Sequence, residues 1–287
     1  MQVVIPHARR SNELLARNLP FIRRNIEHRS IVVITDRENA GTLASLAGDD
    51  VELVDEDALQ SGLSLEFVKK SFEGSVVPPR RAGWYFQQLL KMAWALRPEC
   101  DEWYLVWDSD TFPLRPISLF DGEGTPLFTG SSEHNAVYFE SIDALLGIRR
   151  QVEFSFIAEN MLIRREYMLE MIAEIQGSKS AKGATFFEKI IRAALATSDP
   201  YRAFSEFECY GNFVAARHPG SYRRTYRSSS RKGARRFGLS PSRFDLARLA
   251  RRFEIVSFER WDRIIPPIVA ANKLISVLAH PFLRAKA

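Results

Sequence analysis

The chain has few of the features that point to a secreted or membrane-spanning protein. Its 287 residues include only two cysteines, Cys100 and Cys209. Two cysteines exclude a disulfide scaffold and a four-cysteine zinc site, and they fit a reducing compartment. We see no basic start followed by a long apolar stretch, so we expect no secretory signal. The most apolar stretch, 264–283, is interrupted by three prolines and a lysine, so we expect no spanning helix and a cytoplasmic protein.

Acidic residues are scarce toward the C-terminus. Residues 211–287 contain 17 Lys and Arg against 4 Asp and Glu, whereas residues 1–210 contain 23 against 31. This asymmetry predicts a basic surface for an anionic partner. The segment 223–236 could close over an anionic donor, bind the anionic surface of a membrane or bind nucleic acid. Nucleic acid is disfavoured as a partner, because no DNA-binding motif or aromatic-interleaved surface accompanies the segment.

An apolar run that ends in two carboxylates is the most informative feature that the chain does have. Residues 103–107 read Trp-Tyr-Leu-Val-Trp and predict a strand that is buried on both faces of a parallel sheet. Asp108 and Asp110 follow at its carboxyl end, where open α/β sheets bind ligands. Two carboxylates one residue apart can hold a hard divalent cation that also binds substrate phosphates. The pair therefore indicates transfer from a diphosphate-bearing donor.

Alternating strand and helix signals predict an α/β fold with a mostly parallel sheet flanked by helices. Strands are expected at 2–5, 31–35, 51–54, 103–107, 126–129, 154–157 and 161–163. Helices are expected at 11–29, with a break or kink at Pro20, and at 42–47, 63–72, 84–96, 141–146, 165–175, 186–196 and 205–218. Segment 221–240, rich in Arg, Ser and Gly, is expected to be a linker or mobile loop. We predict a catalytic domain at 1–220 and a basic, helical C-terminal extension at 221–287.

Three interpretations of the carboxylate pair compete. The first is structural, because Asp often caps turns, and Asp55 and Asp57 have the same spacing. The second is a phosphatase of the haloacid dehalogenase type, in which the first Asp is the nucleophile. That family has Thr or Val where this chain has Phe112, and it needs a distal acidic pair that we do not find.

The third interpretation rests on a resemblance. Residues 81–92 (Arg-Ala-Gly-Trp-Tyr-Phe-Gln-Gln-Leu-Leu-Lys-Met), then 103–110, then 158–163 (Ala-Glu-Asn-Met-Leu-Ile) resemble the order of elements in bacterial GT-A glycosyltransferases, over roughly 1–220. The resemblance implies a Rossmann-like GT-A fold and a nucleotide-sugar donor. It also implies that Mn²⁺ or Mg²⁺ bridges Asp110 and the diphosphate, with Asp108 on the ribose or on a metal-bound water.

The resemblance also suggests roles for residues outside the pair. A late histidine completes the metal shell in several such enzymes, and His218 is the candidate in this chain. Asn160 matches an Asn on the strand after the metal strand and could contact the acceptor or the donor sugar. The loops after the first strands hold the nucleoside in GT-A folds, so His7 or Arg9 could contact base or phosphate, and Asp36 base or ribose.

The helix expected at 84–96 carries further donor candidates. Trp84, Gln88 and Lys91 fall at i, i+4 and i+7 on one face. Lys91 could contact the diphosphate, or it could be a surface lysine with a packed stem. Arg81, in the loop before this helix, could clamp a phosphate.

The best candidates for a general base lie in 205–211. An inverting transferase needs a carboxylate within reach of the acceptor hydroxyl, and Glu206 and Glu208 both qualify by type. Ser205 and Glu208 form a possible capping box, so we favour Glu206. A retaining mechanism needs no such base. His134, in a polar loop, could meet the acceptor.

The sequence thus predicts a metal-dependent glycosyltransferase, hexosyltransferase-like, for polysaccharide biosynthesis. It would transfer a sugar to an envelope glycan or a lipid-linked acceptor from a peripheral position on the inner face of the membrane. The apolar residues that follow the basic segment would form an interfacial segment or a helix docked on the catalytic domain. The alternatives are the phosphatase and an anion- or lipid-binding module on a degenerate transferase fold.

Overall fold

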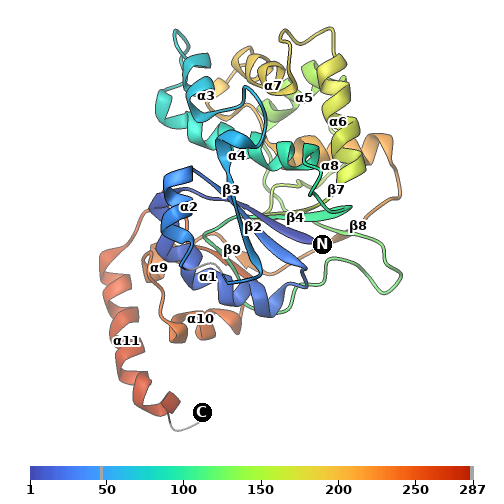
Figure 1. Ribbon diagram of the computed structural model, residues 1–287. Helices are drawn as coiled ribbons and strands as arrows, with labels where there is room; N and C mark the ends of the chain where they lie inside the picture. Colours follow the sequence, from blue (N-terminus) through green and yellow to red (C-terminus); the bar gives the residue numbers. More distant parts are fainter. Residues whose placement is uncertain (46–47, 285–287) are drawn as a thin grey trace. The chain divides into compact units, whose positions relative to one another are not determined.

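The computed structural model describes residues 1–45 and 48–284, and the chain divides into two units (Figure 1). Unit 1 comprises Met1–Ala8, Arg29–Trp107 and Leu119–Thr225. Unit 2 comprises Arg9–His28, Asp108–Ser118 and Tyr226–Ala287. The predicted boundary after residue 220 falls near the last crossing from unit 1 to unit 2. The C-terminal segment is nevertheless not a unit by itself, because two earlier segments belong with it.

Unit 1 is built on a five-stranded sheet with the order β3-β2-β1-β4-β7. Its strands are β1 (Gln2–Pro6), β2 (Ser30–Thr35), β3 (Val51–Asp55), β4 (Trp103–Trp107) and β7 (Asn160–Arg164). Strands β1 to β4 are parallel, and β7 is antiparallel to β4. The apolar runs of β1, β2 and β4 are buried, as expected for strands with both faces covered. The predicted α/β class with a mostly parallel sheet is confirmed.

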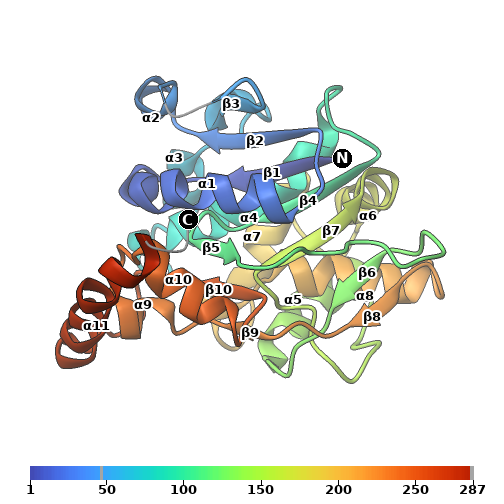
Figure 2. The ribbon, with the colours of Figure 1, turned by 90° about the horizontal axis from the view of Figure 1, so that it is seen from below.

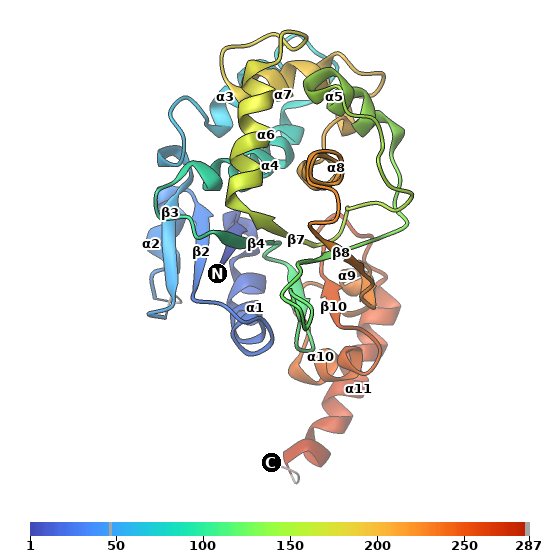
Figure 3. The same cartoon turned by 90° about the vertical axis from the view of Figure 1, so that its right-hand side faces the viewer.

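Helices α3 to α8 gather on one face of this sheet (Figure 3). They are α3 (Leu65–Ser71), α4 (Ala82–Ala93), α5 (Ala136–Leu146), α6 (Arg165–Gly177), α7 (Phe186–Leu195) and α8 (Glu206–Arg217). Helix α2 (Arg37–Leu43) contacts β3, and β6 (Leu127–Thr129) pairs with β8 (Arg223–Thr225). Side-chain caps begin several helices, with Ser64, Thr185 and Ser205 each accepting a bond from the backbone N–H three residues on.

Unit 2 combines a small sheet with α-helices (Figure 2). The sheet has the order β5-β10-β9. Its strands are β5 (Thr111–Pro113), β10 (Ile255–Ser257) and β9 (Ser229–Ser230), and the helices are α1 (Asn12–Asn25), α9 (Gly233–Phe237), α10 (Arg243–Ala250) and α11 (Pro266–Arg284). No helix in the described part of the chain is both long and apolar enough to cross a bilayer.

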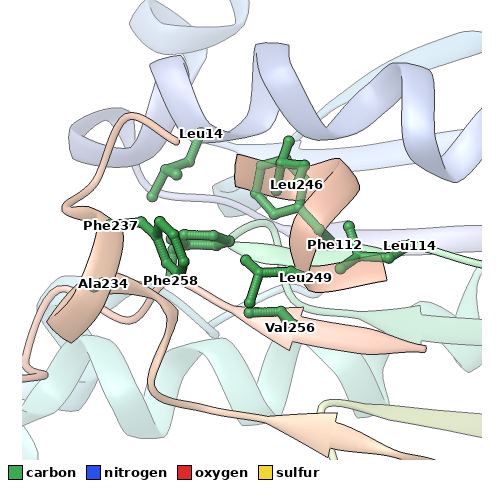
Figure 4. Close-up of a cluster of buried hydrophobic side chains, with 9 residues drawn as sticks. All are labelled: Leu14, Phe112, Leu114, Ala234, Phe237, Leu246, Leu249, Val256 and Phe258. Atoms are coloured by element: carbon green, nitrogen blue, oxygen red, sulfur yellow. The ribbon is translucent and has the colours of Figure 1, made fainter. Parts of the chain in front are cut away.

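The core of unit 2 draws its side chains from all three of its chain segments (Figure 4). The members are Leu14, Phe112, Leu114, Ala234, Phe237, Leu246, Leu249, Val256 and Phe258. The Phe112 and Phe258 rings meet edge to face, with centroids 5.2 Å apart, a favoured aromatic geometry. Burial of this shared core explains why the basic C-terminal segment folds together with α1 and β5.

Several predicted elements differ from those observed. Helix α1 continues through Pro20, since the burial of Leu19 and Ile22 outweighs the one lost backbone hydrogen bond. The helix expected at 42–47 is observed as Arg37–Leu43, because the Asp36 side chain caps its start. Positions 46 and 47 lie outside the described residues.

Two further predictions were wrong. The strand expected at 154–157 is reduced to a single bridge between Ser131 and Ser155. The segment 221–240, expected as a linker or mobile loop, contains β8, β9 and α9. Within this segment, Gly233 leaves no room for a side chain beside Ser257 and Phe258.

Candidate active site

Asp108 and Asp110 lie on a tight turn that directly follows β4 in the chain. The Thr111 N–H donates to the Asp108 carbonyl at 3.1 Å and closes the turn. The amide of Asn18, from α1, donates to the carbonyls of Ser109 and Thr111 at 3.2 and 2.7 Å. Because Asn18 is fully buried, these bonds fix the backbone of the turn. Both carboxylates remain partly exposed.

Strand β10 holds the same turn from another direction. The Phe258 N–H donates to the Asp110 carbonyl at 2.9 Å, and the hydroxyls of Thr111 and Ser257 are 2.8 Å apart. The strand register, with Ser257 opposite Thr111, brings the next acidic residue, Glu259, to the turn. The predicted carboxylate pair is therefore held at fixed positions and has a third acid beside it.

Glu259, the acid beside the pair, was not among the residues predicted from the sequence. Its side chain is buried, and its Oε1 accepts from Nε and Nη2 of Arg231 at 2.9 and 2.7 Å. Burial raises the Glu259 pKa to about 8; Arg231 opposes this rise, and the nearby charges of Asp110 and Asp108 add to it. One signal was available in the sequence: Glu259 follows the apolar run Ile-Val-Ser-Phe, much as Asp108 follows 103–107.

The donor set fits a hard cation that takes its remaining ligands from water and phosphate. The described residues include no group of three or more His, Cys, Asp or Glu side chains arranged to hold a metal ion. His218, the predicted third ligand, ends α8; its Nε2 is 2.6 Å from Glu170 Oε2, and its ring stacks on Tyr167. These contacts are those of a helix-end histidine. With two aspartates alone, a bound cation would take most of its ligands from water and phosphate.

Helices α4 and α8, in unit 1, bring together three other predicted residues. The Lys91 ammonium donates to Glu206 Oε1 at 2.8 Å, and the two side chains are only 5% and 6% exposed. The Glu206 N–H donates to Gln88 Oε1 at 3.1 Å, and the Lys91 ammonium lies 4.5 Å from the Phe207 ring centroid. A phosphate contact by Lys91 or proton transfer by Glu206 would first have to open this ion pair.

Glu208, the other candidate base, is also fully engaged. Its backbone N–H donates to the Ser205 hydroxyl at 3.3 Å, but its carboxylate does not return to Ser205 as a capping box would require. Instead Oε1 accepts from the Ser155 hydroxyl and Oε2 from the Asn212 amide. Burial raises the Glu208 pKa, and these hydrogen bonds oppose the rise.

Arg81 and Trp84 form a stacked pair at the start of α4. The Arg81 guanidinium lies 3.6 Å from the Trp84 ring centroid and 4.7 Å from that of Tyr201. Its Nε donates to the Tyr201 carbonyl at 2.8 Å, and burial lowers the pKa of Arg81. Stacking and this hydrogen bond orient the guanidinium.

Three predicted residues lie at the ends of strands in unit 1. His7 follows β1 and is buried, with its N–H donating to the Ile34 carbonyl. Asp36 follows β2 and caps α2 by accepting from the Asn39 N–H at 2.8 Å. Asn160 begins β7 opposite Trp107, and its buried Nδ2 has no hydrogen-bond partner among the described residues.

Two predicted contacts lie on exposed segments. Arg9 is exposed in the 3-10 helix Arg9–Ser11. His134 is exposed just before α5, with its ring centroid 5.9 Å from that of Phe139.

Several arginines of the basic segment 223–236 form ion pairs or ring contacts within the protein. Arg223 pairs with Asp121 and Glu123, and Arg227 pairs with Glu254. The guanidinium of Arg224 lies 4.1 Å from the Phe154 ring centroid. Arg223, Arg224, Arg231, Lys232, Arg235 and Arg236 are all exposed, so the segment presents positive charge from β8 to α9.

Comparisons with known proteins yield a family and several similar folds. A family model described as "Family of unknown function (DUF6492)" matches residues 8–239. No curated protein matches the sequence.

Several similar solved structures are glycosyltransferases. Apo mouse xyloside xylosyltransferase 1 is 12% identical, over 92% of this chain and 99% of that one, with a TM-score of 0.44. The apo bifunctional glycosyltransferase WbbM is 13% identical, over 92% of this chain and 46% of its own, with a TM-score of 0.47. The galactosyltransferase LgtC, in complex with donor and acceptor sugar analogues, is 13% identical, over 90% of this chain and 87% of its own, with a TM-score of 0.40.

Proposed function

We propose that this chain, which belongs to the family of unknown function DUF6492, is a glycosyltransferase that uses a nucleotide-sugar donor and a divalent cation. The observation that carries the proposal is the Asp108–Asp110 turn. It follows a buried strand of an open, mostly parallel sheet, and Asn18 and Phe258 fix its backbone by hydrogen bonds. Ligands of such sheets bind beyond the carboxyl ends of the strands.

The chemistry of the reaction matches this arrangement. As the bond between sugar and phosphate breaks, positive charge develops on the sugar and negative charge on the departing nucleoside diphosphate. A divalent cation supplies neutralisation of that negative charge when it is bound. Asp108 and Asp110 would hold the cation through their carboxylate oxygens, and the fixed backbone keeps the two carboxylates oriented before the donor arrives.

The role of a general base depends on the stereochemistry. Glu206 is the proposed base for an inverting reaction, with Glu208 as the second candidate, and an inverting enzyme would have to separate Glu206 from Lys91 before proton transfer. A retaining enzyme would leave this pair intact. In a Glu206→Gln protein that is still folded by circular dichroism, an inverting reaction should be abolished and a retaining one should continue at a measurable rate.

The proposed acceptor is an envelope glycan or lipid-linked sugar at the inner face of the membrane, and α11 supports a peripheral position there. Its inner side makes polar contacts: Asn272 donates to the Arg236 carbonyl, and Ser276 donates to Asp245. Its outer side is apolar, with Leu274 and Leu278 60% and 64% exposed. Helix α9, which carries exposed Arg235 and Arg236, contacts α11.

A helix with exposed apolar side chains beside exposed basic residues is typical of one that lies on an anionic bilayer. Leu274→Glu combined with Leu278→Glu should abolish co-sedimentation with phosphatidylglycerol vesicles. Leu96→Glu, a matched change at an exposed leucine of unit 1, should not. Equal binding by all three proteins, or equal binding to pure phosphatidylcholine, would contradict the proposed contact.

The proposed reaction is tested by calorimetric titration of UDP, GDP, CMP and dTDP in the presence of Mn²⁺. We expect one nucleotide to bind, and its affinity to fall at least tenfold with EDTA or in Asp110→Asn. The matched control is Asp143→Asn, which changes an exposed acid on α5. Absence of binding by all four nucleotides, or binding that neither EDTA nor Asp110→Asn affects, would overturn the proposal. A phosphoaspartyl adduct on Asp108 would instead favour the phosphatase.

A further inference from the structure

Glu259 has a buried carboxylate of which only one oxygen is bound. The side chain is 8% exposed, and Oε1 receives two hydrogen bonds from Arg231. Oε2 is also buried, but it has no hydrogen-bond partner within the described part of the chain. Buried carboxylate oxygens are rarely left in this state, because the lost hydration is not replaced. Oε2 is therefore placed to accept a hydrogen bond from a bound ligand or water.

The backbone places this carboxylate beside the two aspartates. Ser257 lies opposite Thr111 in the pairing of β10 with β5, and the Phe258 N–H is bound to the Asp110 carbonyl. Glu259 is the next residue along the chain. The charges of Asp110 and Asp108 both act on its carboxyl group, so the three acids share one environment. All of these residues belong to unit 2.

We propose that Glu259 is a third acidic residue of the cation site, and that its Oε2 accepts a hydrogen bond from a water molecule bound to the cation. This inference rests on the proposed function. A water-mediated contact agrees with the lack of a ready three-ligand group among the described side chains. It also agrees with the tendency of Mg²⁺ to keep several waters when it binds through one or two carboxylates.

Arg231 has a defined part in this arrangement. By binding Oε1 with two donors, it holds the Glu259 carboxylate in one orientation. The charge of Arg231 also offsets part of the repulsion among three acids. Glu259 is accordingly a positioning residue, because it orders a water on the cation and does not contact the reacting sugar.

Direct measurement of Mn²⁺ affinity, by electron paramagnetic resonance of free Mn²⁺ with the full chain, tests the inference without any turnover. Glu259→Gln keeps the shape and removes the charge, and it should weaken Mn²⁺ binding by about 10- to 100-fold. Glu254→Gln is the matched control, because Glu254 makes the corresponding ion pair with Arg227. It should leave Mn²⁺ affinity unchanged.

Glu259→Asp keeps the charge but shortens the reach, so its Mn²⁺ affinity should also be below that of the wild type. It replaces Glu259→Gln in the test if the latter does not fold, as judged by circular dichroism. Wild-type affinity in the folded variant overturns the inference. If Asp110→Asn alone weakens Mn²⁺ binding, the proposed function stands and only the role of Glu259 fails. If the wild type binds no Mn²⁺ with or without nucleotide, both fail.

Discussion

Three buried glutamates, two in unit 1 and one in unit 2, are held in opposite ways. In unit 1, Glu206 is paired with Lys91, and both oxygens of Glu208 accept hydrogen bonds from Ser155 and Asn212. In unit 2, Glu259 has one oxygen bound to Arg231 and the other buried without a partner among the described residues. Fully paired acids stabilise a fold. An incompletely paired acid beside two aspartates indicates a place where something else binds.

This difference changes the ranking of the predicted site residues. Lys91 was a candidate for a phosphate contact and Glu206 for a general base. In the structure the two form a buried ion pair with each other inside unit 1. Asp108 and Asp110 lie on a turn whose backbone is fixed and whose carboxylates remain partly exposed. We therefore propose that ligand binding depends first on the turn, and that the Lys91–Glu206 pair matters first to the α4–α8 contact.

Removing the partner of a paired acid should have the largest effect on stability. Lys91→Met leaves Glu206 buried without its counter-charge, so the free energy of unfolding should fall by about 3–5 kcal/mol. Urea denaturation followed by circular dichroism measures this change. Lys69→Met, at an exposed pair with Glu66, should cost less than about 1 kcal/mol.

The double variant Lys91→Met with Glu206→Met should recover much of that loss, because neither charge is then left unpaired. A Lys91→Met protein of nearly wild-type stability that no longer binds nucleotide would reverse the comparison and make Lys91 a donor contact.

Adding a side chain at Gly211, on α8, should have the next largest effect on stability. A Cβ at Gly211 would overlap the Phe156 ring, and Phe156 is adjacent in the chain to Ser155, a partner of Glu208. Gly211→Ala should therefore destabilise the protein by about 1–3 kcal/mol. Gly177→Ala offers a control, since nothing lies within 4 Å of its Cβ position. Equal thermal midpoints for the two variants would show that the α8 contact tolerates displacement.

The smallest effect concerns Glu56, which follows β3. Burial raises its pKa from 4.5 to about 7, and Asp57, Asp36 and Asp55 add to the rise. Because the folded-state pKa lies above the unfolded one, ionisation of Glu56 opposes folding. The stabilisation that comes from protonated Glu56 is fully present below pH 4.5 and is lost as the pH rises to about 7.

Glu56→Gln should therefore raise the unfolding free energy at pH 8 by about 1 kcal/mol, after screening by water. Its effect at pH 4 should be close to zero. Denaturation curves at both pH values measure the difference, and a variant less stable than the wild type at pH 8 would contradict the expected direction.

Local patterns in the sequence predict the sheet but not the composition of the units. The runs that became β1, β2 and β4 are apolar and β-branched or aromatic, and they lie where they were expected. Helix α1 was harder to predict, because burial of its apolar face overrides the local effect of Pro20. The joining of α1, β5 and the C-terminal segment depends on packing around Phe112 and Phe258, which no local pattern reports.

The site shows the same limit. Asp108 and Asp110 could be proposed as site residues from the sequence because the strand and both acids are adjacent in the chain. Glu259 lies 149 residues after Asp110 and reaches the turn only through the register of β10 with β5. The ion pair of Lys91 with Glu206 joins residues 115 positions apart, so the sequence could not show that these two candidate residues contact each other.

The most direct test of the central claim is turnover of a nucleotide sugar, measured as release of the nucleoside diphosphate. With the nucleotide identified by calorimetry and with Mn²⁺ present, the wild type should release it, and Asp143→Asn should match the wild type. Asp110→Asn should reduce the rate by about 10²- to 10³-fold without a change in thermal midpoint. A rate that survives both EDTA and Asp110→Asn would contradict the account.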